Sequence, residues 1–318
     1  MSLFDDLVDM RKDRSSGVLK RNEAPLPAFL SDLAMTESAQ PGLWWERYGC
    51  DFVELIPEKP NKKTGVPEPA YNTFKLEKKE WTEKLVKIAE NSSPAEAVLR
   101  AYVDRQKRIA QSMSPNGISF TMELSSRLIT GTGIPHPIEN GLLFHPTLGC
   151  PYIPGSSVKG MVQSFADEWL RGDAYTEVPS ELGEVMTRIF GQPERLAGSQ
   201  AHKSGITALG SVAFLDAIPI TRPKIVADVM TPHVGKYLTG GATYPKEDVA
   251  PIPLYFPVVE KGCRLRFTLV PTVAAGLKNE EEVSSDILLA GGWLVAGLRD
   301  IGIGAKTKSG YGRFIGPC

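Results

Sequence analysis

The chain has 318 residues, of which 42% are hydrophobic and 23% charged, a composition typical of a soluble globular protein and not of a disordered or fibrous one. The formal net charge is -1, from 36 Lys and Arg against 37 Asp and Glu, which argues against a surface that binds nucleic acid all over. The sequence contains no apolar stretch long enough for a membrane span and no export signal, so we expect a cytoplasmic protein. It contains no CxxC pair, and we expect neither a metal nor a cofactor.

The first third of the chain predicts helices around a surface loop. Residues 57–69, PEKPNKKTGVPEP, are rich in proline and lysine, as surface loops and linkers are. Residues 76–113 are rich in Lys, Glu and Ala, and Ser92, Ser93 and Pro94 form a helix start signal within them. We therefore expect two helices there and an N-terminal helical extension over residues 1–114.

The next segment predicts a strand followed by a helix. Over residues 118–125 apolar and polar side chains alternate, as in a half-buried strand. Further on, Ser156 or Ser157 is a good N-cap for a helix. Apolar residues recur after it on one helical face: Val158, Met161, Val162, Phe165 and Trp169.

The remaining core elements complete a recognisable order. We expect strands at residues 212–215 and 265–269, a helix capped by Ser284 or Ser285 and ending near Arg299, and a last strand over residues 307–315. The order β-α-β, long insertion, β-α-β is that of a split βαβ unit. Residues 115–318 are therefore predicted to form an α+β, ferredoxin-like (RRM-like) domain with a long insertion between its second and third core strands.

A glycine-rich loop, GIGAKTKSGYGRF, precedes the last predicted strand. Its glycines predict positive φ angles or a close backbone approach, and its lysines suit a phosphate. The spacing differs from that of a nucleotide-binding P-loop. A plain helix-to-strand turn is the alternative. PGSSVKG, at residues 154–160, points to the same chemistry because a helix N-terminus attracts anions, although a simple N-cap with a solvated Lys159 also explains it.

The insertion at residues 218–255 is the third candidate region. It is long for a loop between two strands, and it mixes prolines, glycines, basic residues and apolar side chains. We expect a protruding, thumb-like element that contacts a nucleic-acid duplex, with a subunit contact as the alternative. The predicted RNA-binding residues of all three regions are Gly155, Ser156, Ser157, Lys159, Lys224, Met230, His233, Lys236, Tyr237, Gly302, Gly304, Lys306, Lys308, Gly310 and Arg313.

The motif GLLFHPTLGCPYIPGSSVKGMVQSFADEW, together with the terminal GIGAKTKSGYGRF, resembles the RAMP superfamily of CRISPR-associated proteins. The segment DVMTPHVGKYL, at residues 228–238, resembles a subunit of the type III-B (Cmr) RNA-guided effector complex. The resemblance implies a non-catalytic structural subunit of that ribonucleoprotein in antiviral defence. The resemblance implies that this subunit binds guide RNA through the RNA backbone, towards the 3′ end of the guide. The other implied partners are target RNA and other RAMP subunits.

An enzyme is the rival hypothesis. In the RNA-cutting subunits of such complexes the loop after the first strand carries a catalytic Asp, whereas this chain reads TGTGIPHPIENG there, without Asp. A metal-independent endoribonuclease that processes guide RNA by transesterification would need His145 or His233 as general base. Lys159 or Lys306 would stabilise the phosphorane.

Overall fold

The structure, a computed structural model, falls into two compact units, each described here by itself. The first comprises Met1–Ser92, Pro135–Asn140 and Ala227–Phe256, and the second comprises Ser93–Ile134, Gly141–Val226 and Pro257–Cys318. The residues that the structure describes are 40–47, 54–56, 59–60, 67–68, 71–73, 78–91, 96–113, 116–134, 136, 141–171, 180–191, 209–231, 253–272 and 280–317.

The first unit is organised around tryptophans. Its helices are α3 (Pro41–Arg47) and α4 (Lys78–Asn91), and its short strands β1 (Glu54–Ile56) and β4 (Tyr71–Thr73) pair, as do β2 (Lys59–Pro60) and β3 (Pro67–Glu68). The rings of Trp44 and Trp81 lie 4.7 Å apart and join α3 to α4. Trp45 stacks on His136 at 4.6 Å, and both tryptophans of α3 are buried. His136 is therefore a packing residue.

The second unit contains an antiparallel sheet with strand order β11-β5-β10-β6. Its strands are β5 (Ile118–Leu124), β6 (Val212–Phe214), β10 (Arg264–Pro271) and β11 (Phe314–Ile315), with β7 (Ile218–Pro219) also paired to β10. The register places Leu265 opposite Met122 and Phe267 opposite Phe120. The predicted strands at residues 118–125, 212–215 and 265–269 are thus confirmed, and the chain is α+β.

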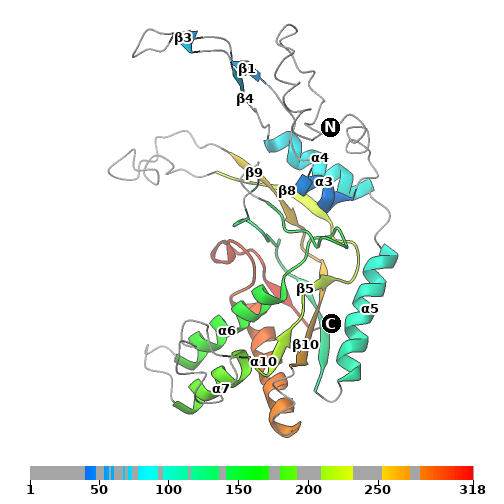
Figure 1. The fold of residues 1–318 in the computed structure, drawn as a ribbon, viewed down its shortest axis with the longest axis vertical. Coiled ribbons are helices and arrows are strands. Elements are labelled where there is room, and N and C mark those ends of the chain that lie inside the picture. The colour runs from blue at the N-terminus through cyan, green and yellow to red at the C-terminus, as the bar shows by residue number, and fades with distance from the viewer. Residues whose placement is uncertain are drawn as a thin grey trace, which may run out of the picture. The chain divides into compact units, whose positions relative to one another are not determined.

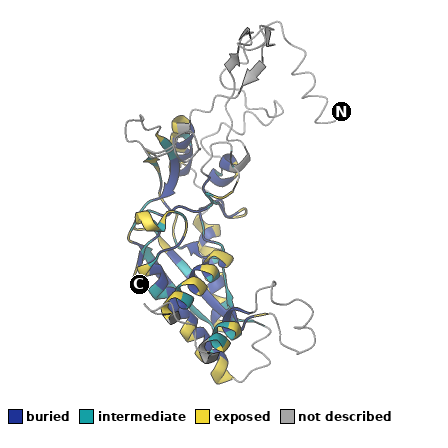
Figure 2. Ribbon diagram, turned by 90° about the vertical axis from the view of Figure 1, so that its left-hand side faces the viewer, coloured by how far each residue is buried: buried dark blue, intermediate teal, exposed yellow. Residues whose placement is uncertain are grey.

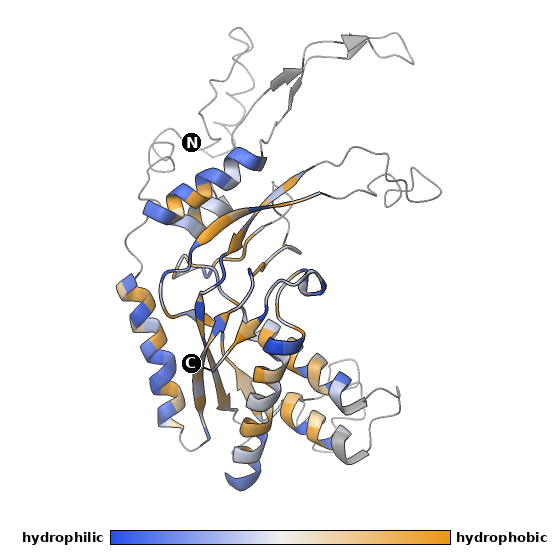
Figure 3. Ribbon diagram, turned by 180° about the vertical axis from the view of Figure 1, so that it is seen from behind, coloured by the Kyte–Doolittle hydropathy of each residue, from blue (hydrophilic) through white to orange (hydrophobic). Residues whose placement is uncertain are grey.

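Helices cover both faces of this sheet (Figure 1). On one side lie α6 (Gly155–Arg171) and α10 (Glu280–Asp300), and a Cβ on Gly291 of α10 would lie 2.6 Å from Ile118 Cδ1. On the other side α5 (Glu96–Ser112) packs against β5, β7 and β10. Figure 2 shows the strands between the helices mostly in the colours of buried and intermediate residues. Figure 3 shows that α5 carries both hydrophilic and hydrophobic stretches.

Helix α5 is attached to the sheet by one face. Its buried residues, Leu99, Val103, Gln106 and Ala110, recur at helical spacing. Leu99 and Val103 pack in a cluster with Leu148, Cys150 and Ile218, and the Gln106 Nε2 donates to the Asp216 carbonyl oxygen at 2.8 Å. The two helices predicted from residues 76–113 are confirmed as α4 and α5, whereas the predicted division at residues 114/115 stays a prediction.

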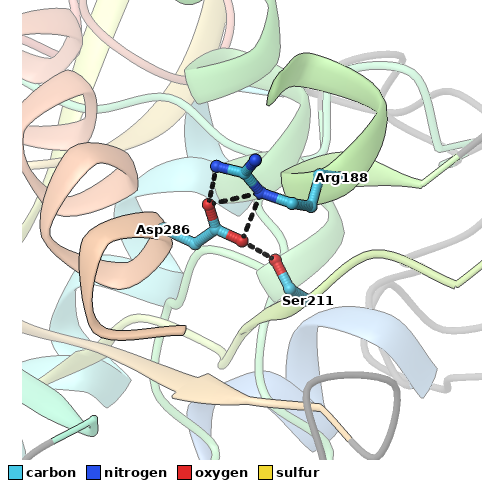
Figure 4. Close-up of polar contacts among 3 residues, drawn as sticks. All are labelled: Arg188, Ser211 and Asp286. Carbon is cyan, nitrogen blue, oxygen red and sulfur yellow. Dashed lines mark hydrogen bonds and ion pairs between the residues drawn. The ribbon is translucent and has the colours of Figure 1, made fainter. Parts of the chain in front are cut away.

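An ion pair between a half-buried Arg188 and a buried Asp286 joins α10 to α7 (Ser180–Phe190), a helix that the sequence patterns did not predict (Figure 4). The Arg188 Nη2 and the Asp286 Oδ1 lie 2.7 Å apart, and the Ser211 hydroxyl donates to Asp286 Oδ2 at 2.6 Å. Asp286 is fully buried, and its hydrogen bond with Arg188 raises the guanidinium pKa. Removing Arg188 would leave a buried charge without its partner, which is a costly change.

Three predicted boundaries were wrong for physical reasons. Helix α10 begins at Glu280, before Ser284 and Ser285, because Glu280, Glu281 and Glu282 in its first turn complement the helix dipole. The predicted last strand, residues 307–315, shortens to β11 because a 3₁₀ turn, Thr307–Ser309, stands at its start. Helix α6 begins at Gly155, so Ser156 and Ser157 lie within its first turn and are not N-caps.

The insertion carries paired strands, β8 (Ile225–Met230) and β9 (Leu254–Val259), which form a two-stranded sheet. Residues 232–252 lie outside the described residues, so a thumb that contacts nucleic acid stays a prediction. Among the helices in the described ranges, none combines the length and apolar character that a membrane crossing requires.

Candidate functional site

Three segments of the second unit meet around one cavity with a volume of about 470 Å³. Residues 130–133, which follow β5, form one part, and the start of α6 with Pro154, Ser157 and Met161 forms another. The glycine-rich loop contributes residues 302–305 and Thr307, while Leu143 and Ile153 complete the lining. The structure thus brings together the two motifs that the sequence predicted as binding regions, although they lie far apart along the chain.

Part of the glycine-rich loop packs tightly on its own chain. A Cβ on Gly312 would lie 1.9 Å from the Ile303 carbonyl oxygen, and one on Gly304 would lie 2.3 Å from that of Ile129. Both glycines have positive φ angles, of 72° and 97°. The Ile303 N–H donates to the Gly312 carbonyl oxygen and the Ala305 N–H to that of Ile129, each at 2.9 Å. These glycines are required because two backbones approach each other there.

The middle of the loop is open. Lys306 has a left-handed φ of 59°, which is unusual for a residue other than glycine, and it opens the 3₁₀ turn that Gly310 closes at φ 90°. A Cβ on Gly310 would meet nothing within 4 Å. Lys306 and Lys308 are exposed, with Lys306 between two residues that line the cavity. Arg313 is half-buried, and its Nη1 donates to the Arg299 carbonyl oxygen at 3.3 Å.

At the start of α6, a carboxylate of the chain itself, that of Asp216, already accepts a backbone N–H group. The Gly155 N–H donates to Asp216 Oδ1 at 2.7 Å, and a Cβ on Gly155 would lie 2.1 Å from the Phe214 carbonyl oxygen. That N–H is therefore engaged and not free for a phosphate. Ser156 is exposed and Lys159 half-buried, whereas Ser157 lines the cavity. Asp216 escaped sequence reasoning because it caps a helix that begins 61 residues earlier.

Thr130, which also lines the cavity, was missed as well. Its side chain is 5% exposed, and its Oγ1 has no hydrogen-bond partner among the described residues. Thr132, Ser157 and Thr307 add further hydroxyls to the lining, and none of the described lining residues carries a charge. The TGTG sequence at residues 130–133 is the signal that pointed to this loop, yet it does not reveal which hydroxyl lacks a partner.

The other predicted binding residues lie apart from this cavity or outside the described residues. Lys224 is exposed and lies near Glu260. Burial alone would raise the pKa of Glu260. The hydrogen bond from Arg127 and the charge of Lys224 instead hold that pKa below its ordinary value. Met230 is half-buried in β8, in the first unit. His233, Lys236 and Tyr237 lie outside the described residues.

His145, a candidate general base, is a packing residue in this fold. Only 9% of it is exposed, and its Nδ1 accepts the N–H groups of Thr147 and Leu148, both at 3.3 Å. The rings of Tyr102 and Tyr152 stand edge-on to it, at 5.3 and 5.1 Å. Burial lowers its pKa, although the Asp216 charge opposes this. Within the described ranges, His, Cys, Asp and Glu side chains form no cluster that would hold a metal ion.

Comparison with known proteins gives consistent matches. The family model described as "RAMP superfamily" matches residues 121–315. A Pyrococcus furiosus protein named CRISPR system Cmr subunit Cmr6 is 30% identical over 250 residues, which cover 64% of this chain and 68% of that protein. The Saccharolobus solfataricus protein named CRISPR system CMR subunit Cmr6 is 29% identical, and the match covers 61% of this chain and 59% of its length.

A solved structure is similar as well. It is described as the cryo-EM structure of the Type III-B Cmr-beta bound to cognate target RNA. One chain of that structure matches with a TM-score of 0.51 and 26% identity, covering 74% of this chain and 70% of its own length. The likeness extends beyond the residues that the family model matches.

Proposed function

Because the chain belongs to the RAMP superfamily, we propose that it is an RNA-binding structural subunit of a type III-B CRISPR effector ribonucleoprotein, corresponding to the sixth (Cmr6) subunit. It holds guide RNA by its backbone towards the 3′ end, in a cytoplasmic complex with other RAMP subunits and target RNA. The observation that carries the proposal is the convergence of PGSSVKG and the glycine-rich loop on one cavity beside the exposed Lys306 and Lys308.

The fold proposed for this function is the ferredoxin-like split βαβ domain. Numbered along the chain, β5, β6, β10 and β11 are the first to fourth core strands, and their order in the sheet is 4-1-3-2. Helix α6 lies between the first two of these strands and α10 between the last two, which supports the assignment. The predicted domain at residues 115–318 would then use α5 as an added cover on the sheet.

We propose further that the chain does not cut RNA. The support comes from His145, which lies buried against Tyr102 and Tyr152 and binds backbone N–H groups through Nδ1. A general base must reach the 2′-hydroxyl that it deprotonates, and His145 would have to leave its packing to do so. A structural subunit needs only contacts to phosphates and sugars, which bind RNA of any sequence.

Affinity purification of the tagged full-length chain from its native host tests this proposal. We expect other RAMP proteins in the eluate, together with small RNAs that share a repeat-derived end. Recovery of the intact chain without RNA and without RAMP proteins would contradict the proposal. Incubating the purified chain with repeat-containing RNA in EDTA should leave the RNA intact, whereas cleavage at a defined position would support the endoribonuclease instead.

A further inference from the structure

A groove between β5 and α10 shares no lining residue with the cavity at the glycine-rich loop. Its volume is about 630 Å³, and its lining comes from residues 118–120 of β5, from one side of α10 and from Pro317. We propose that this groove holds an extended segment of another protein subunit, which adds to the sheet as a strand beside β5. The inference rests on the proposed function, because it names the surface by which the chain holds a neighbouring subunit.

The first argument is that β11 leaves most of the neighbouring edge of β5 unpaired. Strand β5 has seven residues, but β11 pairs only with the last two, Glu123 and Leu124. Gly316, with a φ of 104°, then turns the chain out of the extended conformation, and Pro317 has no N–H to continue the ladder. Within the described ranges no other strand pairs with this edge. Such an edge is a template for another strand, and soluble proteins usually cover or block it.

The main chain of Ser119 faces this open edge. Ser119 lies opposite Thr268 of β10, but the Thr268 carbonyl oxygen accepts the Leu215 N–H at 3.0 Å on the β6 side of β10. In an antiparallel ladder, the two residues of such a pair make no main-chain hydrogen bond with each other. The Ser119 N–H and carbonyl therefore point away from β10, and Ser119 lines the groove. Thr121 has the same orientation but is only 6% exposed, so the accessible part of the edge is residues 118–120.

The second argument is that the groove beside this edge is apolar and open to solvent. Leu288 of α10 is 64% exposed. Ile118, Phe120 and Val295, which also line the groove, are half-buried. Gly292 is exposed, and a Cβ there would meet nothing within 4 Å. Side chains of a strand alternate between its two faces, so every second residue of an added strand would lie over the groove and bury apolar surface there.

The third argument is charge, which favours a protein segment over RNA. Arg299 is the one charged residue among the described residues of the lining, and its Nε already pairs with Asp300 Oδ1 at 2.7 Å. The groove therefore lacks the positive charge that a phosphate backbone requires. The Ser119 main chain offers one donor and one acceptor, which a residue of a neighbouring strand matches. The occupant is thus an extended polypeptide with uncharged, apolar residues at alternate positions.

Glutamate at position 292 tests the groove. Gly292→Glu places a charge among the apolar side chains without a clash in the isolated chain. Gly183→Glu makes the same change on α7, where a Cβ also meets no atom within 4 Å. Each tagged full-length variant is purified from a native-host strain that lacks the wild-type gene. We expect Gly292→Glu to recover at least one neighbouring RAMP subunit about tenfold less than the wild type does, because the charge would be buried, and Gly183→Glu to recover it unchanged.

Two changes at Ser119 test strand pairing itself. Both remove the hydroxyl that lies 3.0 Å from the Thr268 Oγ1, but only Ser119→Pro also removes the N–H that faces the open edge. Proline is tolerated in an edge strand where the missing N–H lies on the free side. Recovery of the neighbouring subunit should fall about fivefold in Ser119→Pro relative to Ser119→Ala, the effect of one main-chain hydrogen bond. Equal recovery by the two folded variants would overturn strand addition.

A cross-link identifies the occupant. The photoreactive p-benzoylphenylalanine replaces the exposed Leu288 in the groove or, as a control, the exposed Val98 of α5 on the other face of the sheet, and the purified ribonucleoprotein is irradiated. We expect position 288, and not position 98, to cross-link to one segment of another protein subunit with apolar residues at alternate positions. A cross-link from position 288 to RNA, to a second copy of this chain or to the chain itself would overturn the inference, as would none. This measurement decides also if Ser119→Pro fails to fold.

The outcomes separate the inference from the function on which it rests. If Gly292→Glu assembles as the wild type does, the groove holds no subunit, and the RNA-binding function stands. The isolated Gly292→Glu chain should bind a fluorescent single-stranded RNA as tightly as the wild type, and a specific loss of that binding would make the groove an RNA surface and overturn the inference. A wild-type chain recovered without RAMP proteins contradicts the proposed function, and the inference falls with it.

Discussion

The glycine-rich loop consists of two parts that look alike in sequence and differ in structure. The inner part comprises residues 302–305 and Gly312. Its glycines lie so close to backbone carbonyl oxygens of the same chain that a Cβ would clash with them. In its outer part, residues 306–310, Gly310 has open space around it and two lysines are exposed. Both parts use positive φ angles. The inner part packs against its own chain, and the outer part is open and exposed.

This difference shows that a high density of glycines can have two causes, a left-handed turn or the close approach of another backbone segment. A glycine with a positive φ is needed wherever the backbone turns left-handed, whether or not another chain segment lies against it. Only the three-dimensional contact separates the glycine that permits packing from the glycine that permits a turn. Substitutions in the two parts should therefore have effects of different size and kind.

The largest effect is expected in the inner part. Gly312→Ala or Gly304→Ala adds a Cβ at 1.9 or 2.3 Å from a backbone oxygen and strains a positive φ. Each should lower the free energy of unfolding by about 3 kcal/mol, measured by urea denaturation followed by circular dichroism. The variants should also lose RNA binding, because residues 302–305 line the cavity. Stability close to that of the wild type would mean that the two backbones lie farther apart than the structure places them.

An intermediate effect is expected from the lysines of the outer part. Lys306→Ala combined with Lys308→Ala should weaken RNA binding about tenfold while leaving stability unchanged, because both side chains are exposed. The slope of log K against log salt should flatten by about 0.7 for each phosphate of a single-stranded RNA that the variant no longer neutralises. Lys107→Ala combined with Lys261→Ala removes the same charge from exposed positions elsewhere in the second unit. If both double variants give the same slope, the outer part makes no phosphate contact.

The smallest effect is expected at Gly310. Gly310→Ala meets no neighbouring atom within 4 Å, so only the positive φ opposes it, at a cost of about 1 kcal/mol in the free energy of unfolding. Gly262→Ala is the matched control, since Gly262 has a φ of 83° and equally open surroundings. An equal destabilisation of the two variants would show that only the positive φ angle requires glycine at position 310. A destabilisation at Gly310 as large as that at Gly312 would remove the distinction.

Much of the fold was predictable because its signals are local. The alternation over residues 118–125 identified β5, and the apolar spacing after Ser157 identified α6. The start of α10 was misplaced because two serines look like caps, whereas three acidic residues before them begin the helix. The short β11 was overestimated because the 3₁₀ turn Thr307–Ser309, which follows the left-handed Lys306, carries no clear sequence signal of its own.

The candidate site was predictable only in outline. Two of its three segments were identified from their glycines, serines and lysines. The sequence did not show that these segments line the same cavity, because that depends on how the sheet and helices assemble. The Asp216 carboxylate at the start of α6 and the unpartnered Thr130 hydroxyl depend on contacts distant in sequence. The contacts that hold His145 against Tyr102 and Tyr152 also form only on folding, so the sequence left its use as a general base open under the enzyme hypothesis.

Helix α5 has a consequence for where nucleic acid can lie. Many RNA-binding sheets stack bases on aromatic side chains of an uncovered face, but here α5 occupies that position through Leu99 and Val103. A base could reach the strands beneath only by displacing the helix. The sheet thus acts as an internal support, and its amide protons, covered on both sides, should exchange with deuterated solvent far more slowly than those of the loops that line the cavity.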